Sequence, residues 1–357
     1  MARTLIIAEG GVNHNGDIAL ALELVDRAAE AGADIIKFQT FDAARLASSS
    51  APKASYQKRQ TGADGGQRAM LERLQLCPTD HAKLIARCKD RQIEFLSSPF
   101  DVISLDLLVG RFGLKRLKLG SGELTNAPLL LDAARSGADI VLSTGMATLS
   151  EIEEALGVLA FGGMSEGSPC SRSDFAASLL DPKAWTWLRS KVTLMHCTTE
   201  YPAAVSDTNL RAMATMKAAF GLPVGYSDHT EGSAISLAAI ALGAVALEKH
   251  FTLDRTLAGP DHAASLEPEE LVGLVRDVRA VEMALGSGIK QPGTAELANR
   301  TVARKSVHAQ ASMETGHIIE AADLTTMRPG DGRSPMDLWD LVGSTVNRRI
   351  SSGEKFN

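Results

Sequence analysis

The stretch "EAGADIIKF", Glu30–Phe38, joins the end of a helix-like segment to a glycine and then to a short apolar run. The same order returns in "RSGADIVLS", Arg135–Ser143, and in "ALGAVALEK", Ala241–Lys249. A glycine directly after a helix commonly adopts the left-handed conformation that ends it, and the apolar run behind it has the length of a buried strand. The repeat therefore predicts helices that lead directly into strands, which is typical of parallel α/β folds.

Eight apolar runs of this kind occur, and the segments between them carry apolar residues at helical spacing. The expected strands cover residues 4–10, 33–40, 93–100, 114–123, 138–146, 191–199, 222–230 and 244–253. The expected helices include residues 17–31, 127–136, 150–159 and 210–220. Eight such units fit a (β/α)8 TIM barrel better than an open doubly wound sheet. No G-x-G-x-x-G motif opens the first unit, which further disfavours a dinucleotide-binding fold.

The alternation of expected strands and helices ends near residue 285, well before the end of the sequence. We expect a TIM-barrel domain over residues 1–285, a polar connector with Gly and Pro over 286–301, and a small second domain over 302–357. A domain of roughly 55 residues is near the size at which independent stability becomes marginal. Two segments interrupt the barrel itself: the polar stretch 44–76 is a candidate lid or substrate loop, and 164–190 is expected to be a solvated insertion.

The composition and charge of the chain argue against several classes of function. The chain has 357 residues, 45% of them hydrophobic, and a formal net charge of −6 without a basic block, so nucleic acid is not an expected partner. The apolar run before Glu9 is too short for a signal peptide, and no stretch has the length that spans a bilayer. The four cysteines are scattered without C-x-x-C spacing, so we expect structural thiols rather than zinc or disulfides, no membrane attachment and a cytoplasmic location.

Polar side chains end all eight expected strands. In a TIM barrel the carboxyl ends of the strands converge on one mouth, and catalysis occurs there. Eight polar exits on one face exceed what helix capping explains. They are Glu9; Lys37 and Gln39; Ser97 and Ser98; Lys118, Ser121 and Glu123; Ser143 and Thr144; His196, Thr198 and Thr199; Ser227 and His229; and Glu248 and His250.

Two of these exits form a candidate metal site. His229 and His250 leave adjacent strands at equivalent positions, and Glu248 lies on the same strand face as His250. Two imidazoles, with a carboxylate in reach of a second ring nitrogen, suit Mn²⁺, Fe²⁺, Co²⁺ or Zn²⁺ acting as a Lewis acid on a carbonyl. The alternative is a pair of hydrogen-bonded core histidines.

Two lysines suggest an anion pocket at the same mouth. Lys37 and Lys118 would supply point charges, and neighbouring hydroxyls and glycine-adjacent N–H groups would supply further donors. The alternative is that one lysine simply pairs with Glu9 or Glu123. The hydroxyls are those of Ser98, Ser121, Ser143 and Ser227.

A set of motifs in one fixed order gives a family resemblance. The chain closely resembles the sialic acid synthase family, which makes nine-carbon sugar acids, and its tail "RKSVHAQASMETGHIIEAADLTTMRPGDGRSP" resembles the C-terminal antifreeze-like (SAF) domain of that family. The resemblance covers nearly the whole chain. The barrel motifs are "IAEGGVNHNGD", "IIKFQT", "LSSPFD", "KLGSGE", "LSTGM", "HCTTEYP", "GYSDHT", "EKHFTLD" and "GPDHAASLEPEEL".

The resemblance implies an activity and a metal. Such enzymes condense phosphoenolpyruvate with an N-acylated mannosamine-type sugar and release phosphate. By motif, His229 and His250 would bind Mn²⁺, which polarises the aldehyde of the open-chain sugar. Glu9 or Glu123 would be the group that transfers a proton.

The resemblance also implies which residues would hold the two substrates. The phosphoenolpyruvate anions would contact Lys37, Ser98, Lys118, Ser121, Ser143 and Ser227. The sugar hydroxyls would contact Glu9, Gln39, Tyr201 and Asp261. His262 is expected to support the site from behind.

Two further implications concern assembly and the choice of sugar. In the family the SAF domain swaps across a homodimer, and the arginine of the "RPG" motif, here Arg328, contacts the acyl group of the sugar in the partner subunit's active site. The forms "ASYQ" and "HCTTEYP" resemble synthases of the legionaminic type, which use 2,4-diacetamido-2,4,6-trideoxymannose instead of N-acetylmannosamine. The form of the second motif also places Glu200 near the substrates.

Two rival functions remain at this point. A metal-independent aldolase would form a Schiff base on Lys37 or Lys118 and would be indifferent to a chelator. A non-catalytic barrel that binds sugar would bind its ligand without releasing phosphate.

Overall fold

The computed structural model describes residues 3–62 and 66–357 of the chain. The chain divides into two compact units, Met1–Gly286 and Ser287–Asn357, which are described separately below. Within the described part of the chain, no helix combines the length and the apolar character that crossing a membrane requires.

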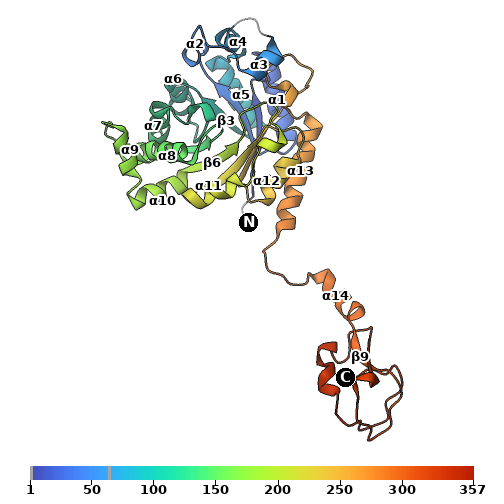
Figure 1. Cartoon of the computed structure of the whole chain (residues 1–357). Helices are drawn as coiled ribbons and strands as arrows, with labels where there is room; N and C mark the ends of the chain where they lie inside the picture. The colour runs from blue at the N-terminus through green and yellow to red at the C-terminus, as the bar shows by residue number, and fades with distance from the viewer. Residues whose placement is uncertain (1–2, 63–65) are drawn as a thin grey trace. The chain divides into compact units, whose positions relative to one another are not determined.

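The larger unit is the TIM barrel that the sequence predicts (Figure 1). Neighbouring strands are parallel and hydrogen-bonded in the order β3-β2-β1-β8-β7-β6-β5-β4, and β3 and β4, at the two ends of this order, contact each other. The strands are β1 (Leu5–Gly11), β2 (Ile35–Thr40), β3 (Glu94–Pro99), β4 (Arg116–Leu119), β5 (Asp139–Ser143), β6 (Val192–Cys197), β7 (Val224–Asp228) and β8 (Ala246–His250).

Helices surround the strands, and glycines end several of them as expected. Gly32, Gly137 and Gly243 have φ angles of 81°, 71° and 94°, in the left-handed region that favours glycine. The longer helices are α1 (Ile18–Glu30), α5 (Pro78–Asp90), α7 (Ala127–Arg135), α8 (Leu149–Met164), α10 (Pro182–Lys191), α11 (Ala212–Phe220), α12 (Ala234–Ala241) and α13 (Pro268–Leu285). Shorter elements are α2 (Ala43–Leu46), α3 (Ser55–Thr61), α4 (Gln67–Leu74), α6 (Val102–Asp106), η1 (Leu107–Arg111), η2 (Ser121–Glu123), α9 (Arg172–Ser178), η3 (Val205–Asp207) and η4 (His262–Ala264).

The inside of the barrel is layered. Ile7, Ile35 and Leu96 form one buried apolar cluster from β1, β2 and β3. Side chains alternate between the two faces of a strand, so the residue two positions later faces the same interior. Those residues are Glu9, Lys37 and Ser98, and the polar mouth is therefore built directly above an apolar floor.

Both interrupting segments are more structured than the sequence indicates. Residues 44–76 contain α3, α4 and most of α2, and α4 buries Met70, Leu71 and Leu74 in a small cluster of its own. The prediction that residues 164–190 form a solvated insertion is wrong for their second half. There α10 contacts β5 and β6 and buries Ala184 and Leu188, because one face of this helix completes the outer layer of the barrel.

The smaller unit has a core of its own. It contains α14 (Thr294–Ala303), the antiparallel pair β9 (Ser306–Ala309) and β10 (Leu324–Met327), α15 (Leu338–Leu341), and the turns η5 (Ala321–Asp323) and η6 (Pro335–Asp337). Its core includes Val307, Met313, Ile319 and Val346. Helix α14 forms in the stretch that the sequence suggested as a connector.

Candidate active site

Five buried side chains form a connected cluster at the mouth of the barrel. We call Glu9, Lys37, Lys118, Ser227 and Glu248 the mouth cluster. Lys37 Nζ lies 2.6 Å from Glu9 Oε2 and 3.8 Å from Glu248 Oε2. Lys118 Nζ lies 3.2 Å from Glu248 Oε1, and Ser227 donates to the same oxygen at 3.0 Å. Side chains from β1, β2, β4, β7 and β8 therefore meet around one carboxylate.

The contacts in the mouth cluster show which carboxylates pair with Lys37 and Lys118. Lys37 pairs with Glu9, as the alternative reading suggested, whereas Lys118 pairs with Glu248 and not with Glu123. Burial raises the pKa of Glu9, and the charge of Lys37 opposes this only in part. Burial would also raise the pKa of Glu248, but the charges of Lys118 and Lys37 outweigh it and the net shift is downward.

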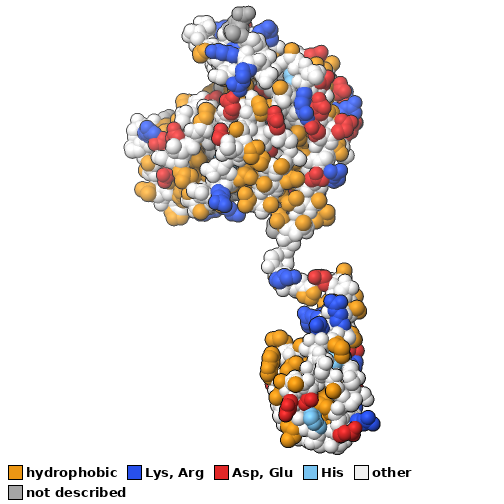
Figure 2. Space-filling model, turned by 45° about the vertical axis from the view of Figure 1, so that its right-hand side comes forward, with side chains coloured by type: hydrophobic (Ala, Val, Ile, Leu, Met, Phe, Trp, Pro, Cys, Tyr) orange, Lys and Arg blue, Asp and Glu red, His pale blue; other side chains and the backbone are white. Residues whose placement is uncertain are grey.

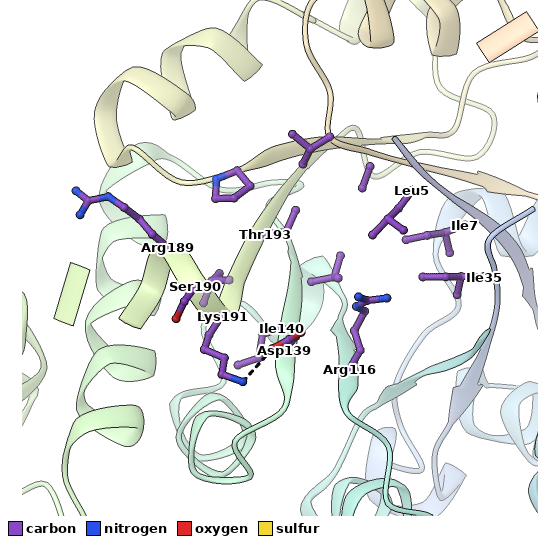
Figure 3. A pocket seen from close by; sticks show the side chains of 15 residues that line it. Leu5, Ile7, Ile35, Arg116, Asp139, Ile140, Arg189, Ser190, Lys191 and Thr193 are labelled. Carbon is purple, nitrogen blue, oxygen red and sulfur yellow. Dashed lines mark hydrogen bonds and ion pairs between the residues drawn. The ribbon is translucent and has the colours of Figure 1, made fainter. Parts of the chain in front are cut away.

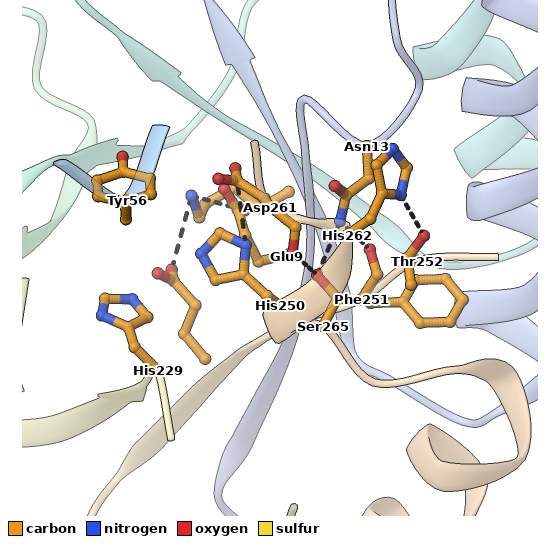
Figure 4. A network of polar contacts seen from close by, with 12 residues as sticks. Glu9, Asn13, Tyr56, His229, His250, Phe251, Thr252, Asp261, His262 and Ser265 are labelled. Atoms are coloured by element: carbon orange, nitrogen blue, oxygen red, sulfur yellow. Dashed lines mark hydrogen bonds and ion pairs between the residues drawn. The ribbon is translucent and has the colours of Figure 1, made fainter. Parts of the chain in front are cut away.

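His229 and His250 lie beside the mouth cluster with their ring centroids 5.4 Å apart (Figure 4). His229 Nδ1 lies 2.6 Å from the carbonyl oxygen of Thr198, so in the neutral ring this nitrogen donates and Nε2 keeps a lone pair. Burial lowers the pKa of His229 to about 4 and that of His250 well below its ordinary value. Both rings are therefore neutral near pH 7, which is the form that binds metals.

The expected place of Glu248 in a metal site needs correction. Its oxygens are engaged by Lys118 and Ser227, and a backbone carbonyl, that of Thr198, occupies the second nitrogen of His229. Ser227 stands between the two residues: its hydroxyl donates to Glu248, and its Oγ lies 3.3 Å from His229 Nε2. The physical reason is that a buried carboxylate is stabilised more by a lysine than by a neutral imidazole.

Unpartnered buried atoms gather at this mouth. Among the described residues, six buried side-chain nitrogen and oxygen atoms lack a hydrogen-bond partner, and three of those at the mouth are Glu248 Oε2, His250 Nδ1 and Thr199 Oγ1. Glu9 Oε2 is also one of the six, but it is ion-paired with Lys37. Buried polar atoms without partners are rare and costly, so their concentration points to a ligand. The free His250 nitrogen and the neutral ring of His229 fit a divalent metal. No group of three or more His, Cys, Asp or Glu side chains in residues 3–62 and 66–357 has a metal-holding arrangement.

The hydroxyls predicted for the anion pocket lie at the carboxyl ends of the strands or just beyond them, and one of them lies beside a lysine. Ser98 Oγ lies 3.5 Å from Lys37 Nζ, and Gln39 is the neighbour of Ser98 in the pairing of β2 with β3. Ser121 Oγ accepts a hydrogen bond from the N–H group of Gly145 at 2.9 Å. Ser143 is buried at the end of β5. These side chains have the chemistry of the predicted anion pocket.

Aromatic side chains cover the two histidines. The Tyr201 ring lies 4.2 Å from that of His229 and 5.3 Å from that of His250, and Tyr56 of α3 packs on Tyr201 at 4.9 Å. Asp261 Oδ2 lies 4.0 Å from His250 Nδ1, and burial raises the pKa of Asp261 to about 6. Tyr56 is not among the predicted site residues, and the "ASYQ" motif that contains it is the sequence signal that points to it.

Three predicted residues lie outside this network. Glu123 lies on η2, where it accepts a hydrogen bond from Asn126 at 2.6 Å, so its candidacy for proton transfer is weaker than that of Glu9. Arg328 belongs to the smaller unit, and its Nε donates to the carbonyl of Ala303. His262 is fully buried and bonds to Thr252 Oγ1 at 2.7 Å, where it supports the loop that carries Asp261 (Figure 4).

A second hollow lies at the opposite end of the barrel, which we call the base (Figure 3). It has a cavity volume of about 170 Å³ and is lined by the amino-terminal ends of strands, with Arg116, Asp139 and Lys191 among its residues. Two of its cations are paired, Arg116 with Glu94 at 2.8 Å and Lys191 with Asp139 at 3.0 Å.

The fold and the mouth define a TIM-barrel enzyme with a buried polar centre. The model of the NeuB family matches residues 24–290, and the model of the SAF domain matches residues 304–355. The chain belongs to the NeuB family, and the resemblance to the sialic acid synthases is confirmed.

Relatives and a solved structure agree with this assignment. The chain is 46% identical over 354 residues to N,N'-diacetyllegionaminic acid synthase of Campylobacter jejuni subsp. jejuni serotype O:2, covering 99% of both chains. It is 42% identical over 348 residues to the synthase of the same name from Legionella pneumophila, covering 98% of this chain and 92% of the relative. The crystal structure of an N-acetylneuraminic acid synthetase from Leptospira borgpetersenii, in complex with citrate, aligns with a TM-score of 0.67 at 34% identity, over 84% of this chain and 90% of the other. The chain is therefore a carbon–carbon bond-forming synthase, which argues against both rival functions.

Proposed function

We propose that this enzyme condenses phosphoenolpyruvate with an N-acylated mannosamine-type sugar to give a sialic-acid-like nine-carbon sugar acid and phosphate. The observation that carries the proposal is the mouth cluster beside two neutral histidines, in a chain whose relatives are named for such products. A trianionic substrate needs buried cations and donors, and this mouth supplies them.

We infer that the sugar is 2,4-diacetamido-2,4,6-trideoxymannose, with N-acetylmannosamine as the second candidate. Two of the relatives are named N,N'-diacetyllegionaminic acid synthase. A 6-deoxy sugar presents an apolar end, and the paired rings of Tyr56 and Tyr201 offer an apolar wall beside Asp261.

His229 and His250 would hold a divalent metal, for which we propose Mn²⁺. When bound, the metal supplies a Lewis acid that polarises the aldehyde of the sugar. His229 is oriented for this by the carbonyl of Thr198, which fixes the proton on Nδ1.

The other residues would bind the two substrates and move protons. Lys37 and Lys118, with Ser98, Ser121, Ser143 and Ser227, would hold the phosphate and carboxylate groups of phosphoenolpyruvate. Asp261, Gln39 and Tyr201 would bind the sugar hydroxyls. Glu9 would transfer a proton, since it touches Lys37 at the centre of the mouth.

We further propose that the enzyme is a domain-swapped homodimer in which Arg328 contacts the acyl group of the sugar bound by the partner subunit. The family resemblance supports this, and so do the exposed side chains of Met336 and Trp339 in the smaller unit, which are 85% and 75% exposed. Figure 2 shows hydrophobic side chains on the surface of that unit. Light scattering behind a size-exclusion column would measure the mass of the assembly, and a mass near 37.8 kDa, that of one chain, would contradict the dimer.

The activity is tested by phosphate release from phosphoenolpyruvate. Metal-stripped protein is assayed with Mn²⁺ restored or withheld, and with each of the two sugars. We expect release that requires both Mn²⁺ and a sugar, and faster release with the diacetamido-trideoxy sugar. Release without metal would contradict the metal site, and a folded, Mn²⁺-loaded protein inert with both sugars would overturn the substrate assignment.

A further inference from the structure

A buried ion pair lies directly behind the two histidines. Lys249 Nζ is 3.1 Å from Asp228 Oδ2, and these side chains are 1% and 0% exposed. Lys249 Nζ also donates to the carbonyl oxygen of Thr230. Asp228 accepts hydrogen bonds from the N–H group of Thr230 at 2.9 Å, from its hydroxyl at 2.8 Å, and from the hydroxyl of Ser236 on α12.

The Asp228–Lys249 pair joins the strand that carries His229 to the strand that carries His250. Strands β7 and β8 are paired in register up to Asp228 opposite Lys249, which is the last pair of that ladder. Asp228 and Thr230 are the two chain neighbours of His229, and Lys249 is the chain neighbour of His250. Lys249, the residue before His250, therefore contacts Asp228 and Thr230, the two residues on either side of His229. The contact with Thr230 lies beyond the last residue pair of the two strands.

Other bonds fix each histidine separately. The carbonyl of His229 accepts from the N–H group of Ala203 at 2.8 Å, and that of His250 accepts from the N–H group of Leu266 at 2.9 Å. Those bonds lead to different loops, so neither of them sets the separation of the two rings.

Stability alone is a poor reason for this pair. Taking two charges out of water costs several kcal/mol per ion, and replacing a buried pair with apolar groups of similar volume is often neutral or stabilising. The alternative reason is positional, because partners behind metal ligands orient them, and losing such a partner typically weakens metal binding 10- to 100-fold.

We propose that Lys249 and Asp228 are positioning residues that hold the imidazoles of His229 and His250 at the separation a divalent metal requires. The inference rests on the proposed function, since it assumes that the two histidines bind a metal. Neither residue touches the metal or the substrates, because both side chains lie on the strand face opposite Ser227 and Glu248.

The test measures Mn²⁺ affinity and stability separately. The double variant Asp228→Asn/Lys249→Met removes both buried charges together, so no unpaired charge remains. We expect its Mn²⁺ dissociation constant, measured from the electron paramagnetic resonance signal of free Mn²⁺, to rise about 10- to 100-fold. The thermal unfolding midpoint of the metal-free variant should stay within a few degrees of the wild-type value.

A matched control separates positioning from general support of the barrel. Arg279 and Asp34 form an ion pair at 2.7 Å, and Asp34 lies just before β2, at the base. Arg279 also bonds Glu282 and the carbonyl oxygen of Thr4, and both groups lose this partner in the variant Asp34→Asn/Arg279→Met. The variant should therefore lower the unfolding midpoint and leave the Mn²⁺ dissociation constant within about twofold. Ser236→Ala is a milder second variant, which removes one bond to Asp228 and should weaken Mn²⁺ binding roughly two- to tenfold.

The outcomes distinguish the two proposals. If the wild type does not bind Mn²⁺, or if His229→Ala binds it equally well, the metal site itself fails and the inference falls with it. If His229→Ala loses binding while the Asp228/Lys249 double variant binds within twofold of wild type, only the positioning role is overturned. If the double variant does not fold, wild-type Mn²⁺ affinity in Ser236→Ala overturns the positioning role.

Discussion

The two ends of the barrel use the same kinds of residue under different conditions. At the base, Arg116 and Lys191 meet Glu94 and Asp139 in simple pairs that are partly exposed to solvent. At the mouth, Lys37 and Lys118 are buried, share the carboxylate of Glu248, and lie among polar atoms without partners. Charge alone therefore does not mark the active site. Burial combined with incomplete pairing is the distinguishing feature, because buried polar groups without hydrogen-bond partners are rare and costly, and a ligand would complete their bonding.

The largest difference between the two ends should appear when one lysine is removed from each. Lys118→Met removes a buried cation expected to face phosphoenolpyruvate, so kcat/KM for phosphate release should fall about 10²–10³-fold. Lys191→Met removes a partly exposed pair at the base, which should leave kcat/KM within about twofold and cost about 1 kcal/mol or less of stability. Steady-state kinetics and thermal unfolding of both variants provide the comparison. Equal losses of activity would mean that the mouth has no special role.

Two glycines sharpen the comparison further. A Cβ at Gly145 would lie 2.8 Å from Ser121 Oγ and even closer to Thr199 Oγ1. Gly145→Ala should therefore displace Ser121, the hydroxyl that we propose binds phosphoenolpyruvate, and lower kcat/KM about 10²-fold. Gly137 has open space around it but a φ of 71°, so Gly137→Ala should cost about 1–2 kcal/mol of stability and leave activity intact. Full activity in Gly145→Ala would contradict the placement of the pocket.

A smaller effect is expected at the aromatic cover of the mouth. Tyr56→Ala removes the ring that packs on Tyr201, and it should raise KM for the diacetamido-trideoxy sugar roughly tenfold, because an apolar contact of this size contributes about 1–3 kcal/mol. Tyr56→Phe keeps the ring and serves as the control. The ratio of kcat/KM values for the two sugars should shift toward N-acetylmannosamine in Tyr56→Ala only, and an unchanged ratio would remove Tyr56 from sugar selection.

The smallest effect should come from the exposed ion pair between Arg59 of α3 and Glu200, whose atoms lie 2.6 Å apart. Exposed pairs contribute about 0.2–1 kcal/mol and are screened by salt. Arg59→Met should therefore change KM for the sugar less than fivefold, and the change should shrink at 1 M salt. A salt-independent loss larger than tenfold would show that Arg59 itself contacts substrate.

The repeating pattern made the barrel predictable, because helix, glycine and strand follow one another in local sequence. Gly32, Gly137 and Gly243 take the expected left-handed conformation. Seven of the eight strands lie within the expected ranges, and β1 extends one residue beyond its range, to Gly11. Much of the site was predictable from the fold. The carboxyl ends of the parallel strands of a TIM barrel meet at one mouth, so Glu9, Lys37 and His250 come together although they are far apart in the sequence.

Other features depended on contacts between distant segments, which local patterns do not encode. The sharing of Glu248 by Lys118 and Lys37 depends on the barrel's register, and the contact of Tyr56 with Tyr201 depends on how α3 folds over the mouth. The polar residues of 164–190 predict an insertion, and they do not reveal that one face of α10 is buried against the barrel. The bound metal, the dimer and the cytoplasmic location stay predictions.

The hydrogen-bonded order of the strands begins at β3 and ends at β4, and these two strands contact each other. We call the junction between them the seam. Backbone amides without a hydrogen-bonded partner strand exchange with solvent deuterium more readily than amides between two paired strands. We therefore expect hydrogen–deuterium exchange to be fastest, among the barrel strands, along this seam. Ser98 stands on β3 and Lys118 on β4, one on each side. An anion bound by both side chains would bridge the seam, and substrate binding would then be visible as slowed deuterium uptake in β3 and β4.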